Sequence, residues 1–191
     1  MREFIYYSTS GRTSGNFDDL MQAGRLDIVC HTIIAAFFLS HNIRKDVKLH
    51  IILNGPPDPP KHIEFVYDKD LPISKKDIAG LLKRILYKYK KGIKSNPFPG
   101  CFIEKKSFMK VIEELKERNV YVLDKKGEDL YSADIKENPV FIIGDEGGIP
   151  KKEKRSLIKT KKIIPISVGP EMYFASHVAV ILNNYLDRKG L

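Results

Sequence analysis

The stretch PVFIIGDEGGIP, residues 139–150, decides the fold because an apolar run passes directly into a glycine-rich turn. Its first half, residues 139–143, predicts a buried β-strand. A second transition of this kind follows where a strand expected at 163–166 runs into SVGP, residues 167–170. Glycine allows positive φ and a close approach of the backbone to a ligand. In open α/β sheets ligands bind beyond the carboxyl ends of the strands, so the two loops predict a binding site, with ordinary glycine turns as the alternative.

Hydrophobic periodicity predicts further strands and helices that alternate along the chain. The expected strands are 4–7, 47–53, 63–67, 120–123, 139–143 and 163–166, and the expected helices are 26–39, 74–89, 108–115 and 173–186. The proline-rich segment 54–60 is expected to be a stiff loop, and NPFPG at 96–100 is expected to break the chain. Strands that alternate with helices predict an α/β fold with a mainly parallel sheet.

Composition favours a single globular domain that spans residues 1–191. Hydrophobic residues form 42% and charged residues 30% of the chain, which excludes a disordered protein. The formal net charge of +9 indicates association with nucleic acid, an anionic membrane or an acidic partner. No apolar run approaches the ~20 residues that span a bilayer, and no secretory signal is readable. We therefore expect a soluble, cytoplasmic protein without a membrane partner.

Several common catalytic motifs are missing. The sequence holds no GxGxxG after a strand, no P-loop, no HExxH and no EF-hand loop. Its two cysteines, Cys30 and Cys101, form no CxxC, and Cys30 is expected in the core. The five histidines, at positions 31, 41, 50, 62 and 177, show no metal-ligand spacing and are expected on the surface or in helix packing. We expect no metal site.

Two polar regions allow a functional and a structural interpretation. The loop after the first strand gathers arginines beside carboxylates, which could hold a phosphate and place a base; the alternative is a solvated, self-paired loop in which Asp18 or Asp19 caps the next helix. The basic run 83–94, which carries Tyr87 and Tyr89, suits RNA, with a solvated helix face as the alternative. The patches 105–106, 151–155 and 159–162 are similarly ambiguous.

Three motifs resemble the archaeal tRNA pseudouridine-54 N1-methyltransferases, which belong to the SPOUT class of S-adenosylmethionine enzymes. The motifs are SGNFDDLMQAGRLDIVC (14–30), IIGDEGGIP (142–150) and ISVGPEMY (166–173), and the resemblance runs from residue 1 to residue 191. It implies a SPOUT-type α/β fold with a C-terminal trefoil knot, roughly residues 120–187, that binds S-adenosylmethionine. It also implies a homodimer that acts on the T-arm of tRNA, and a sulfonium methyl donor needs no metal.

The resemblance also assigns site residues. Asp19 is the expected catalytic base, and Arg12, Asn16 and Arg25 are expected to bind the substrate. The residues expected to bind the cofactor are Leu123, Gly144, Gly147, Gly148, Ser167, Val168, Gly169, Pro170, Glu171 and Met172. The family has a cysteine near the last motif; this chain has none there, so a catalytic thiol is not expected at that place.

The implied reaction demands a base. Pseudouridine carries an imide-like N1–H, which is a poor nucleophile until the proton leaves. An ordinary aspartate, with a pKa of ~3.9, is a weak acceptor, but burial raises such a pKa, and a positioned base contributes about 10²–10⁴-fold. The target base must also be flipped out of the RNA. Alternative functions are a SPOUT methyltransferase that acts on rRNA pseudouridine or a ribose 2′-hydroxyl, and a non-catalytic RNA-binding adaptor.

Overall fold

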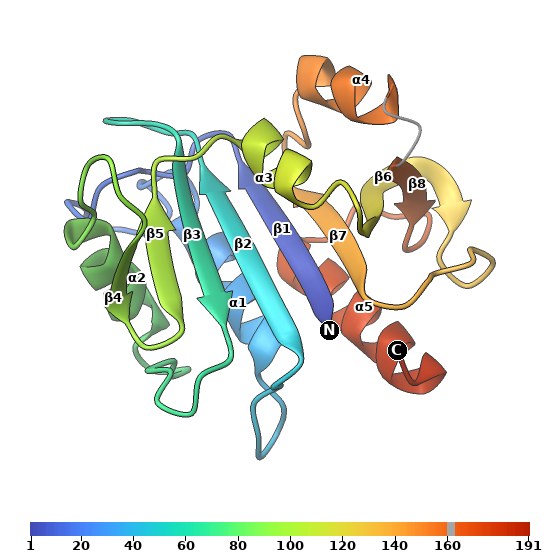
Figure 1. Ribbon diagram of the computed structural model, residues 1–191, viewed down its shortest axis with the longest axis horizontal. Coiled ribbons are helices and arrows are strands. Elements are labelled where there is room, and N and C mark those ends of the chain that lie inside the picture. The colour runs from blue at the N-terminus through green and yellow to red at the C-terminus, as the bar shows by residue number, and fades with distance from the viewer. Residues whose placement is uncertain (160–162) are drawn as a thin grey trace.

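A single eight-stranded sheet organises the protein, whose computed structural model describes residues 1–159 and 163–191 (Figure 1). Its strands are β1 (Arg2–Ser8), β2 (Val47–Leu53), β3 (Lys61–Val66), β4 (Ser95–Phe98), β5 (Cys101–Glu104), β6 (Asn119–Asp129), β7 (Pro139–Gly144) and β8 (Ile163–Ser167). They lie in the order β4-β5-β3-β2-β1-β7-β6-β8. The part from β2 to β8 is parallel and the part from β2 to β4 is antiparallel, so the expected mainly parallel α/β sheet is confirmed.

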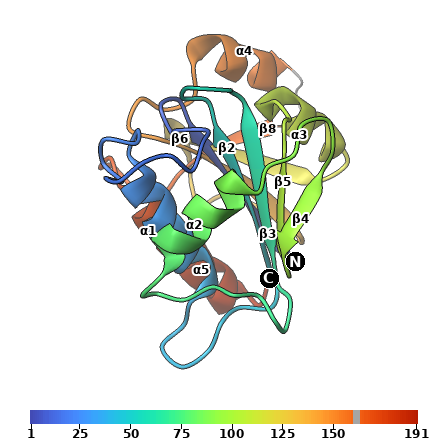
Figure 2. The same cartoon turned by 90° about the vertical axis from the view of Figure 1, so that its left-hand side faces the viewer.

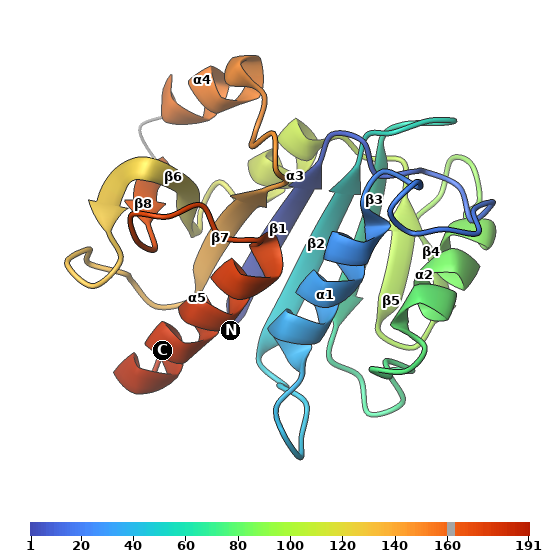
Figure 3. The same ribbon diagram turned by 180° about the vertical axis from the view of Figure 1, so that it is seen from behind.

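Helices cover both faces of the sheet. They are α1 (Leu26–Phe37), α2 (Ile78–Tyr87), α3 (Phe108–Glu114), α4 (Lys151–Lys159) and α5 (Ala175–Lys189). Seen nearly edge-on in Figure 2, the sheet has α1, α2 and α5 on one side and α3 on the other. Figure 3 shows α1 and α5 side by side across the parallel strands. Among the described residues, every helix is too short or too polar to cross a bilayer.

The central strand β1 separates two hydrophobic cores. Phe4 and Tyr6 belong to the larger core beneath α1, α2 and α5, whereas Ile5 and Tyr7 belong to the smaller core beneath α3. All seven residues of β1 are buried because strands flank it on both sides and helices cover both faces. A strand buried on both faces reads as a continuous apolar run, which is why this one was visible in the sequence.

The start of α1 differs from the expectation. Neither Asp18 nor Asp19 caps this helix; its N-cap is Arg25, a residue with left-handed φ and ψ of 61° and 39°. The Asp19 carboxylate instead accepts a hydrogen bond from the Gln22 amide at 2.8 Å, one turn before the helix begins. The cap of α3 is the ordinary one, because the Ser107 hydroxyl accepts from the Lys110 amide.

Several boundaries also differ. The proline-containing segment 96–100 lies in a β4–β5 hairpin, and Pro97 is tolerated because β4 is an edge strand. The helix expected from residue 74 begins at Ile78 and ends before Tyr89. The lysine-rich segment after residue 150 forms α4, and β6 continues six residues beyond Leu123, to Asp129. These elements were hard to predict because their sequences are rich in charge or proline. Tertiary packing stabilises them instead of local propensity.

Two histidines were placed wrongly by the sequence pattern. His50 lies on β2 and His62 on β3, and both are buried, with 4% and 1% of their surface exposed. They belong neither to the surface nor to a helix. Cys30 lies on α1 and is buried in the larger core, as expected, and both cysteines are free thiols.

Candidate functional site

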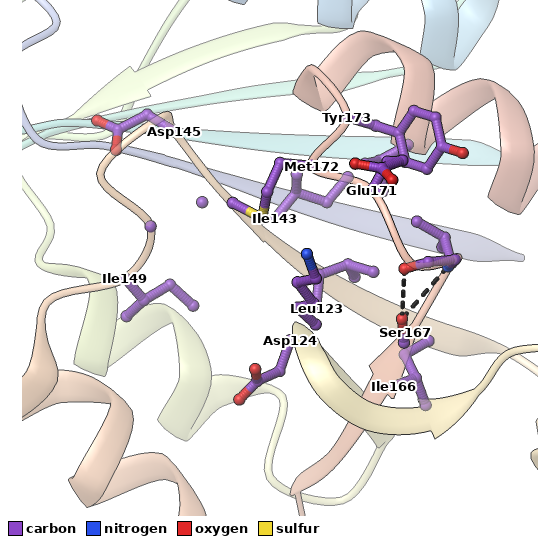
Figure 4. Close-up of a pocket in the computed structure, with 16 residues that line it drawn as sticks. Leu123, Asp124, Ile143, Asp145, Ile149, Ile166, Ser167, Glu171, Met172 and Tyr173 are labelled. Carbon is purple, nitrogen blue, oxygen red and sulfur yellow. Dashed lines mark hydrogen bonds between the residues drawn. The ribbon is translucent and has the colours of Figure 1, made fainter.

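The loops that follow β7 and β8 form a pocket together with residues 123–125, which lie in the middle of β6 (Figure 4). They meet because β7 and β8 both pair with β6 in parallel, so the carboxyl ends of β7 and β8 lie at one edge of the sheet, beside these β6 residues. The pocket is lined by residues 123–125, 143–145, 148, 149, 166–169, 171–173 and 178. Eight of the ten residues expected to bind a cofactor line it: Leu123, Gly144, Gly148, Ser167, Val168, Gly169, Glu171 and Met172. Gly147 and Pro170 lie in the same loops without lining it.

Gly144 makes the tight turn after β7 possible. A Cβ atom at this position would lie 2.8 Å from the backbone of Gly148 and 2.9 Å from the amide nitrogen of Ile149. Real Cβ atoms do not approach backbone atoms this closely, so any side chain here forces the loop apart. The glycine therefore lets residues 144–149 fold back on themselves and open their inner side to the pocket.

The loop after β8 is held by its own serine. The Ser167 hydroxyl donates to the Gly169 carbonyl at 2.9 Å and lies 3.3 Å from the Gly169 amide nitrogen. Gly169 has a φ of 142°, a conformation that L side chains rarely adopt. The serine and the glycine thus shape a turn whose backbone forms one wall of the pocket.

Asp145 ties the first strand to the pocket. Its Oδ2 atom accepts hydrogen bonds from the amide and the hydroxyl of Thr9, both at 2.6 Å, and its Oδ1 atom accepts from the Gly147 amide at 3.0 Å. Its own amide donates to the Tyr7 carbonyl at 2.9 Å. The carboxylate therefore fixes the loops after β1 and β7 relative to each other.

Eight residues of this lining were not predicted from the sequence. Five of them lie within the quoted motifs: Ile143, Asp145, Ile149, Ile166 and Tyr173. Their position at strand ends and beside the predicted loop residues was the signal that could have identified them. The remaining lining residues that were not predicted, Asp124, Lys125 and Val178, lie outside the quoted motifs.

Asp124 connects the pocket to α4. Its carboxylate lies 2.5 Å from the Lys154 Nζ atom, and this hydrogen bond holds the pKa of Asp124 below its usual value. Because Lys154 lowers this pKa, Asp124 is an anion at the edge of the pocket.

A second pocket adjoins the first and shares Gly144, Asp145 and Tyr173 with it. Arg25 lines this second pocket from the start of α1. Its Nε and Nη2 atoms donate to the two carboxylate oxygens of Asp27, both at 3.0 Å, and this pairing holds the pKa of Asp27 low and that of Arg25 high. Its remaining Nη1 atom lies 3.6 Å from Glu146. The guanidinium is therefore charged, and Arg25 lines the pocket together with Glu146.

The backbone at Arg25 is strained, because a non-glycine residue rarely occupies the left-handed region. Such strain is retained where the surrounding structure requires it, and it often marks a functional residue. Here it turns the side chain from the preceding loop toward Asp27 and Glu146.

The other residues expected to bind substrate lie on the loop between β1 and α1. The Arg12 amide donates to the Ala23 carbonyl at 3.0 Å, and the Arg12 Nε atom is buried without a partner among the described residues. Asn16 and Asp19 are exposed. The pockets described above do not include these three residues, so their functional roles remain predictions.

The fold, of the SPOUT α/β type, and a match to a family model place the chain in a class of protein, the S-adenosylmethionine-dependent RNA methyltransferases. A family model described as "Putative SAM-dependent RNA methyltransferase" matches residues 1–191. Nep1 of Archaeoglobus fulgidus, solved with bound S-adenosylhomocysteine, has a similar fold, with a TM-score of 0.66, 14% identity and 99% of each chain covered.

Curated relatives identify the family more closely. The tRNA (pseudouridine(54)-N(1))-methyltransferase of Methanocaldococcus jannaschii is 39% identical and covers 100% of this chain and 98% of its own length. The enzyme of that name from Pyrococcus abyssi is 33% identical and covers 100% of both. The chain belongs to this family of RNA methyltransferases.

The packing of Gly144 makes a prediction about cofactor binding. Gly144→Ala is expected to weaken S-adenosylhomocysteine binding at least tenfold, because the new Cβ forces residues 144–149 apart. Isothermal titration calorimetry measures the affinity. Ser156→Ala, at an exposed residue of α4 that does not line the pocket, is the control, and its binding should stay within about threefold of the parent. Unchanged affinity in folded Gly144→Ala would contradict the proposed role of this turn.

Proposed function

We propose that this protein transfers a methyl group from S-adenosylmethionine to N1 of pseudouridine at position 54, in the T-loop of tRNA. Full-length relatives that carry this activity in their names support the proposal, with 39% and 33% identity. The observation that carries it is the pocket at the ends of β7 and β8 and beside Leu123 of β6, which the family's cofactor motifs surround. An intact pocket of this kind disfavours a non-catalytic RNA-binding adaptor. The substrate would place the activity in the cytoplasm.

The residues of the pocket fit the cofactor. Leu123, Ile143, Ile166 and Val168 offer apolar walls for a purine ring, and Glu171 and Asp124 offer carboxylates for the cationic amino and sulfonium groups. In Figure 4, Glu171 and Asp124 lie on different sides of the apolar residues. When bound, S-adenosylmethionine supplies an electrophilic methyl group on a positively charged sulfur. We assign Gly147 and Pro170 to the same site through the loops they share with lining residues.

The target base would enter the second pocket, because that pocket adjoins the first through Gly144, Asp145 and Tyr173. Loss of the N1 proton leaves negative charge on the ring nitrogen and the neighbouring carbonyl oxygen. Arg25 is placed to stabilise this charge, since it lines the second pocket and Asp27 holds its guanidinium. A fixed cation in a partly enclosed site stabilises a developing anion without reorganising.

Asp19 is the proposed proton acceptor, with Arg12 and Asn16 as substrate-binding residues. All three lie on the loop that ends at Arg25, so a bound RNA segment that reaches the second pocket would pass beside them. The loop also contacts the basic helix α2: the Lys83 Nζ atom donates to the Phe17 carbonyl at 2.5 Å. This contact brings the cationic run 83–94 next to the loop and favours it as the surface that meets the tRNA backbone.

The knot of the SPOUT class remains a proposal for roughly residues 120–187, within a single domain of residues 1–191. Ile166 on β8 pairs both with Leu123 and with Glu128, so β6 curls around β8. Gly127 permits this close contact, since a Cβ there would lie 2.5–2.6 Å from the Ile166 backbone. A chain that passes through a loop of itself requires such an approach of two backbones.

We also propose a homodimer that uses the outer face of α5. Phe174 and Val180 are 55% and 54% exposed, and the Phe174 ring packs edge-to-face on His177 with centroids 5.6 Å apart. Met172, which lines the first pocket, is 75% exposed beside them. Exposed apolar groups in a row mark an interaction surface, and this one would place a partner next to the site.

The dimer makes a prediction for sedimentation. Analytical ultracentrifugation of the parent chain should show twice the monomer mass, and Val180→Asp should weaken self-association at least tenfold because it buries a charge in the interface. Ile93→Asp, at a residue that is equally exposed but far along the chain from α5, is the control and should remain dimeric. A monomeric parent chain would refute the dimer.

The activity is tested by nucleoside analysis. The protein is incubated with labelled S-adenosylmethionine and two tRNA transcripts, one with pseudouridine and one with uridine at position 54. Mass spectrometry of the digested RNA should find N1-methylpseudouridine in the first transcript only, because uridine has its N1 in the glycosidic bond. Methylation of a ribose, or of rRNA but not tRNA, would favour the alternative targets. Absence of any transfer with intact RNA binding would favour the adaptor.

The role of Asp19 is tested with a variant that preserves its turn. Asp19→Asn keeps an Oδ1 atom that accepts from the Gln22 amide but cannot take up the proton. We expect the rate of methyl transfer to fall about 10²–10⁴-fold, with little change in cofactor affinity. Asp18→Asn, at the neighbouring exposed carboxylate, is the control and should retain nearly full activity. Full activity of Asp19→Asn would show that another group accepts the proton.

A further inference from the structure

A buried cluster of two histidines and a glutamate lies at the sheet, away from the pockets. The antiparallel register of β2 and β3 places His50 opposite Glu64, and His62 lies two residues from Glu64 on the same face of β3. The Nδ1 atom of His50 and the Nε2 atom of His62 are 2.9 Å apart. The Oε2 atom of Glu64 lies 3.8 Å from the same His50 nitrogen. All three side chains are buried, and their ligand atoms lie within 4.8 Å of one another.

The outer nitrogens of the two rings face carboxylates. The Nε2 atom of His50 lies 3.3 Å from Glu3, and the Nδ1 atom of His62 lies 3.1 Å from Glu104. Each carboxylate also has a cationic partner: Arg118 lies 2.6 Å from Glu3, and Lys106 lies 2.8 Å from Glu104. Carboxylates paired in this way are ionised and can only accept hydrogen bonds. Both outer nitrogens must therefore carry the hydrogen.

The inner nitrogens consequently have no hydrogen to share between them. A neutral imidazole carries one N–H, and in both rings the outer carboxylate takes it. The inner nitrogens of His50 and His62 then present lone pairs to each other at 2.9 Å, in a place shielded from water. Two buried acceptors this close require a cation between them. The cation can be a proton shared by the rings or a metal ion bound by both.

We propose that His50, His62 and Glu64 bind a divalent transition-metal ion of the Zn²⁺ type. Imidazole and carboxylate are the ligands that Zn²⁺ takes in proteins, at about 2.0–2.2 Å. Metal-binding histidines usually donate their other N–H to a carboxylate, and Glu3 and Glu104 occupy those positions here. Glu64 favours the metal over the proton, because an anionic oxygen beside the two nitrogens completes a set of three protein ligands.

The ion must also be compatible with the nearby lysines. Lys94 lies 3.2 Å from the Oε1 atom of Glu64, and Lys48 lies 3.6 Å from its Oε2 atom, the one that faces His50. Lys48 is beyond hydrogen-bond distance of Glu64. Both lysine side chains are partly exposed, Lys48 at 27% and Lys94 at 40%. They can turn toward solvent when an ion takes over the charge of Glu64. Tetrahedral ligation needs the two nitrogens roughly 3.3 Å apart, a widening of a few tenths of an ångström.

The site would be structural. Through the ligands and their carboxylate partners it joins β1, β2, β3 and β5. Glu3 lies at the start of β1, whereas the second pocket lies against Tyr6 and Ser8 at the other end of this strand, so the ion would stabilise the antiparallel half of the sheet without touching the reaction.

Metal titration of the full, untagged chain tests the proposal. The chain is treated with a chelator, dialysed, and titrated with Zn²⁺ alone and with Co²⁺ alone. We expect one Zn²⁺ per chain, a higher thermal midpoint with Zn²⁺, and the visible absorption of Co²⁺ bound by nitrogen and oxygen ligands. A stoichiometry near zero, or an unchanged thermal midpoint, would show that the rings share only a proton and would overturn the proposal.

Three variants locate the ion. His62→Gln should abolish binding, and Glu104→Gln, which alters only the partner of His62, should weaken it about 10–100-fold. Glu104→Gln leaves all three ligands in place, so it remains informative if His62→Gln fails to fold. His41→Gln, at an exposed histidine, is the control and should bind as the parent does. Equal binding by the parent and folded Glu104→Gln, or loss of binding in His41→Gln, would contradict the assignment.

Discussion

The parallel pairing of β1, β7, β6 and β8 is the constraint on which the rest of the structure depends. Parallel neighbours bring the ends of β7 and β8 to one edge, and there the loops that follow these strands form the pocket with residues 123–125 of β6. Backbone contact keeps these loops together, because Gly144 lies against Gly148 and Gly127 lies against Ile166. A side chain larger than hydrogen at either glycine would separate segments that the site needs side by side.

A few shared residues join the two pockets. Asp145 lines both of them, and its carboxylate holds the loop after β1 through Thr9. That loop continues to Arg25, which has a left-handed backbone, caps α1 and lines the second pocket. The proposed cofactor site and the proposed base site are thus fixed to each other through the sheet. Methyl transfer needs such fixed geometry, because small displacements of the reacting atoms cost rate.

The elements that the sequence revealed were those whose side chains match their surroundings. The runs at β1 and β7 are apolar because both faces of these strands are buried, and Ser107 is a cap that any reader of the sequence would recognise. The hairpin of β4 and β5 and the lysine-rich α4 were missed, since their local signals are proline and charge. The cofactor motifs were found through family resemblance. The geometry of Arg25 could not be predicted, because no sequence pattern indicates a strained φ.

By itself the sequence determined the α/β class and the two glycine loops, because glycine, apolar periodicity and loop position are local properties, and its resemblance to a family supplied most of the pocket lining. Tertiary structure alone decided which loops meet, how Asp145 joins them, and that His50, His62 and Glu64 converge. The spacing of these three residues carries no metal signature, since strand register, a long-range property, brings their side chains together. Convergence of distant residues depends on the packing of the whole sheet, which no short segment encodes.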